Sequence, residues 1–264
     1  MTAITVIAIL AAAATIYGFV AMDSCERVKV ATKGKKKKYQ VQEVPETGIL
    51  FMVIMAVALI VRYIAAAKYF GNETDMNCFI AWGDMVFKDG IGNFYSSDSF
   101  TDYPPGYMYI LYMVGAIRHV LGVAWNSTLS VMLTKTPAII ADLATAYLLF
   151  RIAGKRWTQK GAGILTAIYL FAPAVLLDGA IWGQTDAVFT FFVVLMIYLV
   201  TERKLIPSYF VFAVAVLVKP QSLIFTPVLI YGIIDQVFLD GFDWKNFWKN
   251  LGLGLAAIAM IALL

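Results

Sequence analysis

The sequence predicts an all-α, polytopic membrane protein, and three observations support that prediction. Hydrophobic residues make up 61% of the 264 residues and charged residues only 14%, whereas roughly a quarter of the residues of a soluble domain are charged. The mean hydropathy is +0.77, and the apolar runs are long enough for helices in lipid. No segment shows the alternation of an outer-membrane barrel. We expect about seven spans in one membrane domain, residues 1–264.

The first two apolar runs are predicted spans joined by a basic loop. Thr2–Met22 lacks the basic segment that opens a signal peptide and is too long for its apolar core. The stretch from there to Glu46 carries seven Lys and Arg, which places it in the cytoplasm and the N-terminus outside. Residues 1–46 thus form an N-terminal span and a basic cytoplasmic loop that precede the external loop and its flanking spans. The second span, Thr47–Ala67, runs outward, and Arg62 can snorkel to its outer end.

Residues 71–123 are predicted to form an external loop with two interfacial helices. Gly71–Gly106 has six acidic residues and one basic residue, as suits the external side. Apolar residues recur along Met76–Asp89 as on an amphipathic helix, the first interfacial one. Tyr107–Val123 is the second. If it crossed the membrane, the basic turn Arg151–Lys160 would lie outside, against the positive-inside rule.

The next apolar runs predict the body of the bundle. We expect spans at Leu129–Ile152, Ala162–Ile181 and Val188–Val200. Ser208–Ile234 is interrupted by Lys219-Pro220-Gln221. As one helix it would hold a lysine and a helix-breaking proline near its middle. We favour a broken pair, which puts Lys219 in an outward cavity, because irregular backbone at membrane depth must line protein or water.

The C-terminal region is predicted to begin with an interfacial segment. Asp235–Asn250 is rich in Trp and Phe and has balanced charge, which indicates a cytoplasmic position at the membrane surface. The last apolar run, Leu251–Leu264, is shorter than the roughly 20 residues that a span needs and has no polar tail. We therefore expect part of the C-terminal sequence to be missing.

Ionisable residues in or beside spans are expensive in lipid, so they are the first functional candidates. They are Arg62, Lys135, Asp142, Asp178, Asp186 and Lys219, most of them at predicted outward ends. Asp142 follows Lys135 by seven residues, so it lies on the same helix face and deeper. We interpret Asp142 as a buried structural partner.

The external loop adds carboxylates of its own. Asp75 stands at the predicted N-cap of the first interfacial helix, where it is exposed, although it could serve only as a cap. Asp102 precedes the rigid corner Tyr103-Pro104-Pro105, where a capping role is the stronger interpretation. Lysines that neutralise phosphate and a carboxylate that activates a hydroxyl suit a lipid-linked anionic substrate. The same groups would also suit a proton-coupled transporter.

Several short motifs, taken in order, resemble one known family. They are Glu73-Thr74-Asp75-Met76 with Phe79 and Trp82, then Gly90, Phe94-Tyr95, Asp102 to Tyr107, Trp182 to Asp186, and Val218 to Gln221. This set resembles the bacterial Gpi18-related mannosyltransferases, which belong to the GT-C superfamily of membrane glycosyltransferases. The resemblance implies a GT-C-like helical fold with two interfacial helices in its first large external loop.

The resemblance also implies a reaction and roles for particular residues. A sugar, mannose or another hexose, would move from a polyprenyl-phosphate donor to a glycan, lipid or protein acceptor on the external face of the cell membrane. Asp75 would be the general base, Asp186 would be the second catalytic carboxylate and would orient the acceptor or assist Asp75, and Lys219 would bind the donor phosphate. Further substrate-binding candidates are Lys135, Arg62, Asp102, Tyr103, Trp182, Gln184 and Gln221.

Two alternatives to a hexosyltransferase stay open. One is a non-catalytic subunit of a membrane glycan-assembly complex, with a partner chain, and the other is a lipid or sugar transporter. No cofactor is implied, and no metal-ligand spacing is present, although superfamily members differ in their need for a divalent metal. The basic residues that give the net charge of +4 lie mostly in loops, so they indicate the orientation of the protein in the membrane and not nucleic-acid binding.

Overall fold

The computed structural model describes residues 46–95 and 100–263, and in these residues the chain forms helices and no strands. The predicted first span and most of the basic loop lie outside the described residues. The helices are α2 (Glu46–Lys68), α3 (Glu73–Asp89), α4 (Ile91–Phe94), α5 (Pro105–Val120), α6 (Thr128–Ala153), α7 (Gln159–Leu170), α8 (Pro173–Leu176), η1 (Leu177–Trp182), α9 (Asp186–Thr201), α10 (Leu205–Val218), η2 (Pro220–Phe225), α11 (Thr226–Ile233), η3 (Ile234–Leu239) and α12 (Trp244–Leu263).

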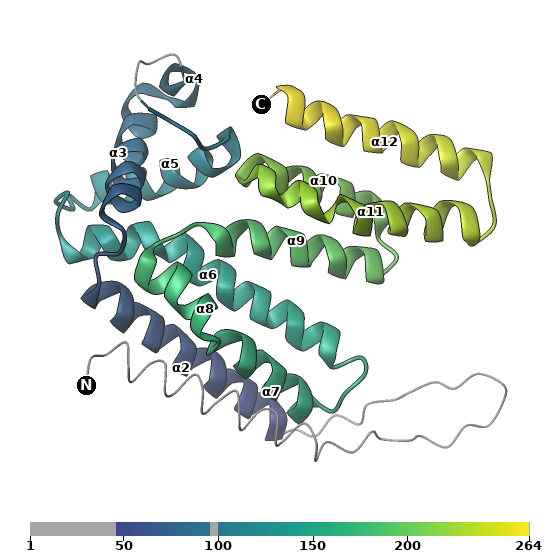
Figure 1. The fold of residues 1–264 in the computed structure, drawn as a ribbon, viewed down its shortest axis with the longest axis horizontal. Coiled ribbons are helices and arrows are strands. Elements are labelled where there is room, and N and C mark those ends of the chain that lie inside the picture. The colour runs from purple at the N-terminus through teal and green to yellow at the C-terminus, as the bar shows by residue number, and fades with distance from the viewer. Residues whose placement is uncertain (1–45, 96–99, 264) are drawn as a thin grey trace.

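Four helices in this part of the chain are long and apolar enough to cross a membrane, and a bent pair makes a fifth candidate. The four are Leu50–Lys68, Thr128–Ala153, Pro220–Leu239 and Trp244–Leu263. The shorter apolar helices α9 and α10 lie among them (Figure 1). These helices confirm the prediction of a polytopic helical membrane protein.

The helices α2 and α6 pack antiparallel, and their polar contacts fix the register. The ammonium group of Lys135 donates to the carbonyl of Tyr69 at 2.8 Å, just beyond the end of α2. Seven residues deeper on each helix, Arg62 Nε donates to Asp142 Oδ2 at 3.0 Å. Because α2 therefore ends beside the start of α6, the intervening segment leaves and returns at the same end of the bundle (Figure 1). This agrees with the prediction that the second interfacial helix does not cross.

The helices α3, α4 and α5 form a small unit across that end of the bundle (Figure 1). A Cβ added to Gly115 would meet the backbone of Gly83, so these two glycines let α5 and α3 approach closely. Beside this contact, Arg118 donates to Asp84 Oδ1 at 2.8 Å. The side chain of Asp84 is thus engaged on the α5 side of α3, away from Asp75.

The predicted span Ala162–Ile181 is bent rather than straight. The helix α7 ends at Leu170, and after a break the chain continues through α8 and η1, at an angle of 54° to α7. Pro173 opens the second half, where its missing N–H costs nothing. The bend follows from this proline, which has no N–H to donate within a continuous helix.

The predicted break at Lys219 is present. The helix α10 ends at Val218, Lys219 has extended backbone with φ −154° and ψ 118°, and Pro220 opens the next helical stretch. That stretch runs through η2, α11 and η3 to Leu239. The predicted interfacial segment Asp235–Asn250 is not a separate element, because its start ends this helix and its end belongs to α12; its position at the membrane surface stays a prediction. The helix α12 begins at Trp244 and has 20 residues, so it is long enough to span.

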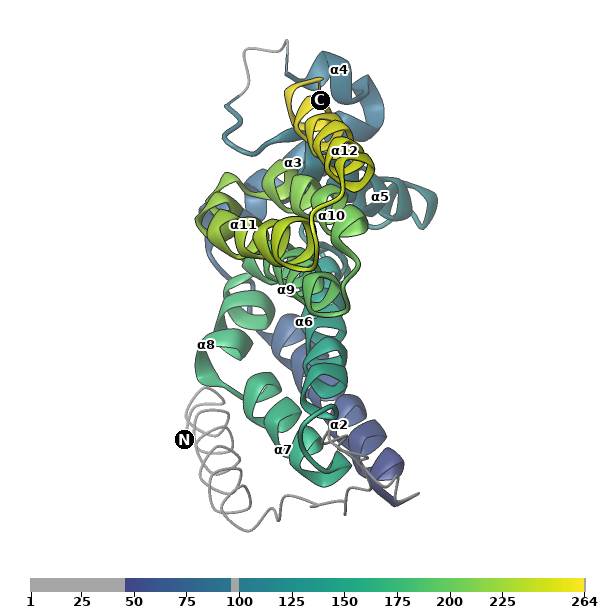
Figure 2. The ribbon, with the colours of Figure 1, turned by 90° about the vertical axis from the view of Figure 1, so that its right-hand side faces the viewer.

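The basic turns gather at the other end of the bundle, which we call the basic end (Figure 2). It consists of two basic turns, Gly154–Thr158 after α6 and Glu202–Lys204 after α9, together with residues 240–243 before α12, which carry two aspartates. Lys155 pairs with Glu202 there, and Arg203 pairs with Asp235 at 3.3 Å and with Asp240. The opposite end, covered by α3–α5, carries the candidate site.

Candidate functional site

Side chains from four separate segments meet where α3–α5 cover the bundle. We call them the polar cluster: Asp75 of α3, Tyr103 of the loop before α5, Trp182 at the end of η1 with Gln184 and Asp186 shortly after it, and Lys219 after α10. The sequence predicted all six as site residues. The structure brings them together, while the role of each stays a prediction.

Asp75 is held by two donors, one from the end of η1 and one from the turn before α9. Its Oδ2 atom accepts a hydrogen bond from Gln184 Nε2 at 2.6 Å and another from Trp182 Nε1 at 3.1 Å. The expectation that Asp75 is the N-cap of α3 is wrong. Asn72 is the N-cap, and its side chain accepts the backbone N–H of Asp75. The carboxylate of Asp75 is therefore free of the capping role and points to the cluster.

Lys219 forms an ion pair with Asp186 and lies between two aromatic rings. Its ammonium nitrogen is 5.9 Å from the ring centre of Tyr103 and 5.7 Å from that of Phe189. The side chain of Lys219 is 16% exposed and that of Asp186 is 43% exposed. Both charges therefore reach the surface of the cluster while remaining paired with each other.

Tyr103 connects the two halves of the cluster. Its hydroxyl lies 3.5 Å from Gln184 Oε1, to which it donates, and accepts a hydrogen bond from Thr185 Oγ1 at 3.3 Å. Burial raises the pKa of the Tyr103 phenol, so it stays protonated near neutral pH. A continuous path of contacts therefore runs from Asp75 through Gln184 and Tyr103 to Lys219.

Two glycines allow the turn before α9 to hold this geometry. Gly183 has φ 92°, and a Cβ there would meet the sulfur of Met76 and Lys135 Cε. Gly71 has φ 101°, and a Cβ there would meet the carbonyl oxygen of Trp182. That same oxygen accepts the N–H of Asn72 at 3.0 Å. The sequence analysis did not predict the roles of Gly71 and Gly183. A glycine between Trp and Gln in a short turn could have indicated a left-handed backbone at Gly183.

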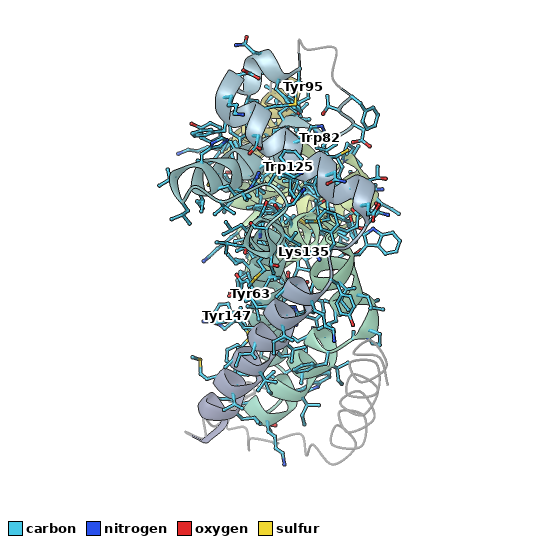
Figure 3. The ribbon with its side chains drawn as sticks, turned by 90° about the vertical axis from the view of Figure 1, so that its left-hand side faces the viewer. Tyr63, Trp82, Tyr95, Trp125, Lys135 and Tyr147 are labelled. Atoms are coloured by element: carbon cyan, nitrogen blue, oxygen red, sulfur yellow. The ribbon has the colours of Figure 1, made fainter. Side chains whose placement is uncertain are left out.

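Lys135 lies beneath the cluster and is used within the fold. Figure 3 labels it below Trp82 and above Tyr63. The side chain is 1% exposed, and its ammonium group donates to the carbonyls of Tyr69, Ala180 and Ile181 at 2.8, 3.2 and 2.9 Å. These carbonyls lie at the C-terminal ends of α2 and η1, where a cation is favourable. All three N–H donors of Lys135 are occupied.

Arg62 is also separate from the cluster. The residue is 0% exposed, and its guanidinium binds Asp142 and the carbonyl of Leu170 at 2.9 Å. The expectation that Arg62 snorkels to the surface is therefore wrong, because Asp142 holds it inside the protein. The interpretation of Asp142 as a buried structural partner is confirmed, with Arg62 rather than Lys135.

The remaining predicted residues lie at the margin of the cluster. Asp102 is exposed but close enough to raise the pKa values of Cys78 and Tyr103. Gln221 is exposed in η2. In the described ranges no group of three or more His, Cys, Asp or Glu side chains is placed to hold a metal ion.

Cys78 provides a chemical probe of the margin of the cluster. Burial raises the pKa of its thiol, and Asp102 and Asp75 raise it further. The thiolate fraction at neutral pH is therefore low, and alkylation is expected to be slower than for a free thiol and to accelerate with rising pH. In a Cys25→Ser background, Asp102→Asn should increase the alkylation rate at pH 8 about twofold, whereas Glu73→Gln should leave it unchanged. Equal rates for all three proteins would contradict this prediction.

Comparison with known proteins gives one family. A family model described as GPI transamidase subunit PIG-U matches residues 79–264, more than two thirds of the chain. Searches of curated proteins and of solved structures returned no match. The matched region contains Tyr103, Gln184, Asp186 and Lys219, whereas Asp75 precedes it.

Proposed function

The chain belongs to the family of the GPI transamidase subunit PIG-U, and on that premise we propose that it is a non-catalytic subunit of a membrane complex that acts on GPI. In this proposal the polar cluster binds the polar part of a lipid-linked glycan. The basic end faces the cytoplasm, as the positive-inside rule predicts, so the cluster faces the opposite side.

The main support for this proposal is that the charged side chains of the cluster are already bonded to other side chains of the cluster. Lys219 is already neutralised by Asp186, and the Oδ2 atom of Asp75 already accepts two N–H donors. Such groups are fixed in orientation and suit hydrogen bonding to a hydroxyl-rich ligand. Trp182 is 51% exposed, and its indole ring offers an apolar surface on which a sugar ring can pack.

A GT-C hexosyltransferase related to the Gpi18-type enzymes is the second candidate, and one observation favours it. Asp75 and Lys219, the general base and the phosphate-binding residue that the resemblance implies, lie in the same cluster and are linked through Gln184 and Tyr103. In this candidate Asp75 deprotonates the acceptor hydroxyl and Lys219 stabilises the leaving phosphate of a polyprenyl-phosphate donor. A transporter has no comparable support.

Two assays separate these functions. In cells whose copy of this chain is deleted, GPI attachment to a reporter protein should be lost and should return with the wild-type chain. Lys219→Ala leaves Asp186 without its partner and should lower attachment about tenfold, equivalent to about 1.4 kcal/mol of binding. Lys88→Ala, an exposed change at the far end of α3, is the matched control and should restore attachment fully.

The second assay uses the purified chain in nanodiscs with polyprenyl-phosphate mannose or glucose. The subunit proposal expects no hexose transfer by the chain alone. Hexose transfer that Asp75→Asn abolishes would overturn the proposal in favour of the glycosyltransferase. Full GPI attachment in the deleted cells would equally rule out the subunit function.

A further inference from the structure

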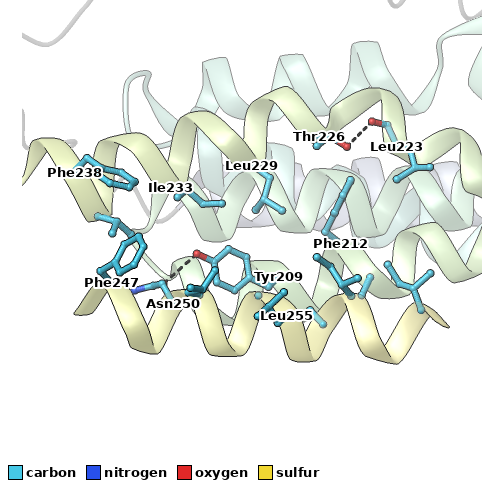
Figure 4. A pocket seen from close by; sticks show the side chains of 17 residues that line it. Tyr209, Phe212, Leu223, Thr226, Leu229, Ile233, Phe238, Phe247, Asn250 and Leu255 are labelled. Carbon is cyan, nitrogen blue, oxygen red and sulfur yellow. Dashed lines mark hydrogen bonds between the residues drawn. The ribbon is translucent and has the colours of Figure 1, made fainter. Parts of the chain in front are cut away.

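An apolar groove lies between α10, α11 and α12, away from the polar cluster (Figure 4). Its volume is about 440 Å³, within the roughly 300–1,000 Å³ typical of ligand pockets. Its polar side chains are satisfied inside the protein. The Tyr209 hydroxyl donates to Asn250 Oδ1 at 3.1 Å, and the Thr226 hydroxyl donates to the carbonyl of Leu223 at 2.7 Å. The groove therefore presents hydrocarbon to its occupant.

A polar cavity adjoins the groove at the basic end. Its volume is about 360 Å³, and Asn250 lines both cavities. Arg203 and Lys204 contribute positive charge to it, and Asp240 contributes a negative charge. Arg203 is neutralised by Asp235 and Asp240. Among the described residues the structure gives Lys204 no ion-pair partner, so its charge is available to a ligand.

Aromatic residues indicate the depth of the two cavities in the membrane. Trp244 and Trp248, in the first turns of α12, are 65% and 61% exposed. Tryptophan concentrates at the boundary between headgroups and hydrocarbon. Asn250 follows Trp248 by two residues, so the polar cavity lies at headgroup level, and the groove continues along α12 toward Ile261 at hydrocarbon depth.

We propose that the two cavities bind one anionic phospholipid from the surrounding bilayer. An acyl chain lies in the groove, and the headgroup lies in the polar cavity with its negative charge beside Lys204. Lysine near a membrane surface attracts anionic lipid. The polar cavity adjoins the apolar groove in the same way that the polar headgroup of a phospholipid adjoins its apolar acyl chains. Neither cavity is lined by a residue of the polar cluster, and the proposal does not depend on the proposed function.

Two glycines of α12 provide a matched test of the groove. Gly254 lines the groove and Gly252 does not, and a Cβ at either would meet open space. The protein is reconstituted in nanodiscs of equal parts phosphatidylcholine and phosphatidylserine, and the phospholipid that it retains on release is measured by native mass spectrometry. Gly254→Leu should lower the retained phospholipid about fivefold because the leucine fills the groove, whereas Gly252→Leu should retain the wild-type amount.

The headgroup contact is tested in the same nanodiscs. Lys204→Ala should reduce the preference for phosphatidylserine over phosphatidylcholine about fivefold, as expected for one lysine at a membrane surface. Lys245→Ala removes an exposed lysine that lines neither cavity and should keep the preference.

Three outcomes would overturn the proposal. They are a wild-type protein that retains no phospholipid, equal retention by the two glycine variants, and a dimer of the chain that Gly254→Leu dissociates. The last would identify the groove as an interface between two copies.

Discussion

Replacing Arg62 by methionine is expected to destabilise the folded bundle by about 3–5 kcal/mol, the cost of breaking a buried ion pair from one side. The guanidinium is completely buried and bridges three helices, because it lies on α2 and binds Asp142 of α6 and the carbonyl of Leu170 at the end of α7. Without Arg62, the carboxylate of Asp142 is left buried and unpaired.

A double variant separates the charge effect from the loss of packing. Arg62→Met combined with Asp142→Leu removes both charges, so most of the lost stability should return. The unfolding free energy in detergent, measured for the wild type, each single variant and the double variant, gives the coupling energy directly. A double variant as unstable as the sum of its single variants would show that the pair contributes no coupling. Lys68→Met, at the exposed end of α2, is the control.

Replacing Gly183 by alanine is expected to cost about 2–5 kcal/mol and to disturb the polar cluster. Two effects add: the left-handed backbone at φ 92° is unfavourable for alanine, and the new Cβ meets the Met76 sulfur and Lys135 Cε. Because the next residue, Gln184, holds Asp75, a shift of this turn should also lower any activity that depends on the cluster.

The conformational and steric effects at Gly183 can be measured separately. Met76 is completely buried, so Met76→Ala is itself destabilising and serves as the reference. In that background the contact with sulfur is gone and the backbone strain remains, so Gly183→Ala should cost less there than in the wild type. Gly252→Ala, in an α12 position with open space around it, should leave the unfolding free energy unchanged or raise it slightly. A Gly183→Ala protein as stable as the wild type would contradict the assigned role of the turn.

Much of the fold could be predicted because its signals are local. Apolar runs of span length predicted α2 and α6, and Lys219-Pro220 predicted the break after α10. Charge predicted that residues 71–123 do not cross, because a crossing would have moved the basic turn after α6 to the outside. In each case the deciding residues are neighbours along the chain.

The residues of the candidate site were predicted from the sequence, but most of the contacts among them were not. Asp186 and Lys219 were identified because ionisable residues beside spans are rare and costly. Asp75 was identified as an exposed carboxylate of the external loop, and Gln184 through the family resemblance. The bonds among them could not be predicted, because Asp75 and Gln184 are 109 positions apart and meet only through the packing of α3 on the bundle. The apolar groove was not predicted either, since its walls have the same composition as any lipid-facing helix.

The sequence by itself therefore determined that this is a helical membrane protein with its basic turns at one end and its unusual polar residues toward the other. Helical period, span length and charge are properties of short segments, and these settle such features. Only the tertiary structure decided the partner of each charge. Arg62 and Asp142 meet because the antiparallel register of α2 and α6 sets them side by side, while Lys135, on the same face as Asp142, is taken by the carbonyls at two helix ends. Register and helix crossing depend on contacts between distant segments, and no local pattern specifies them.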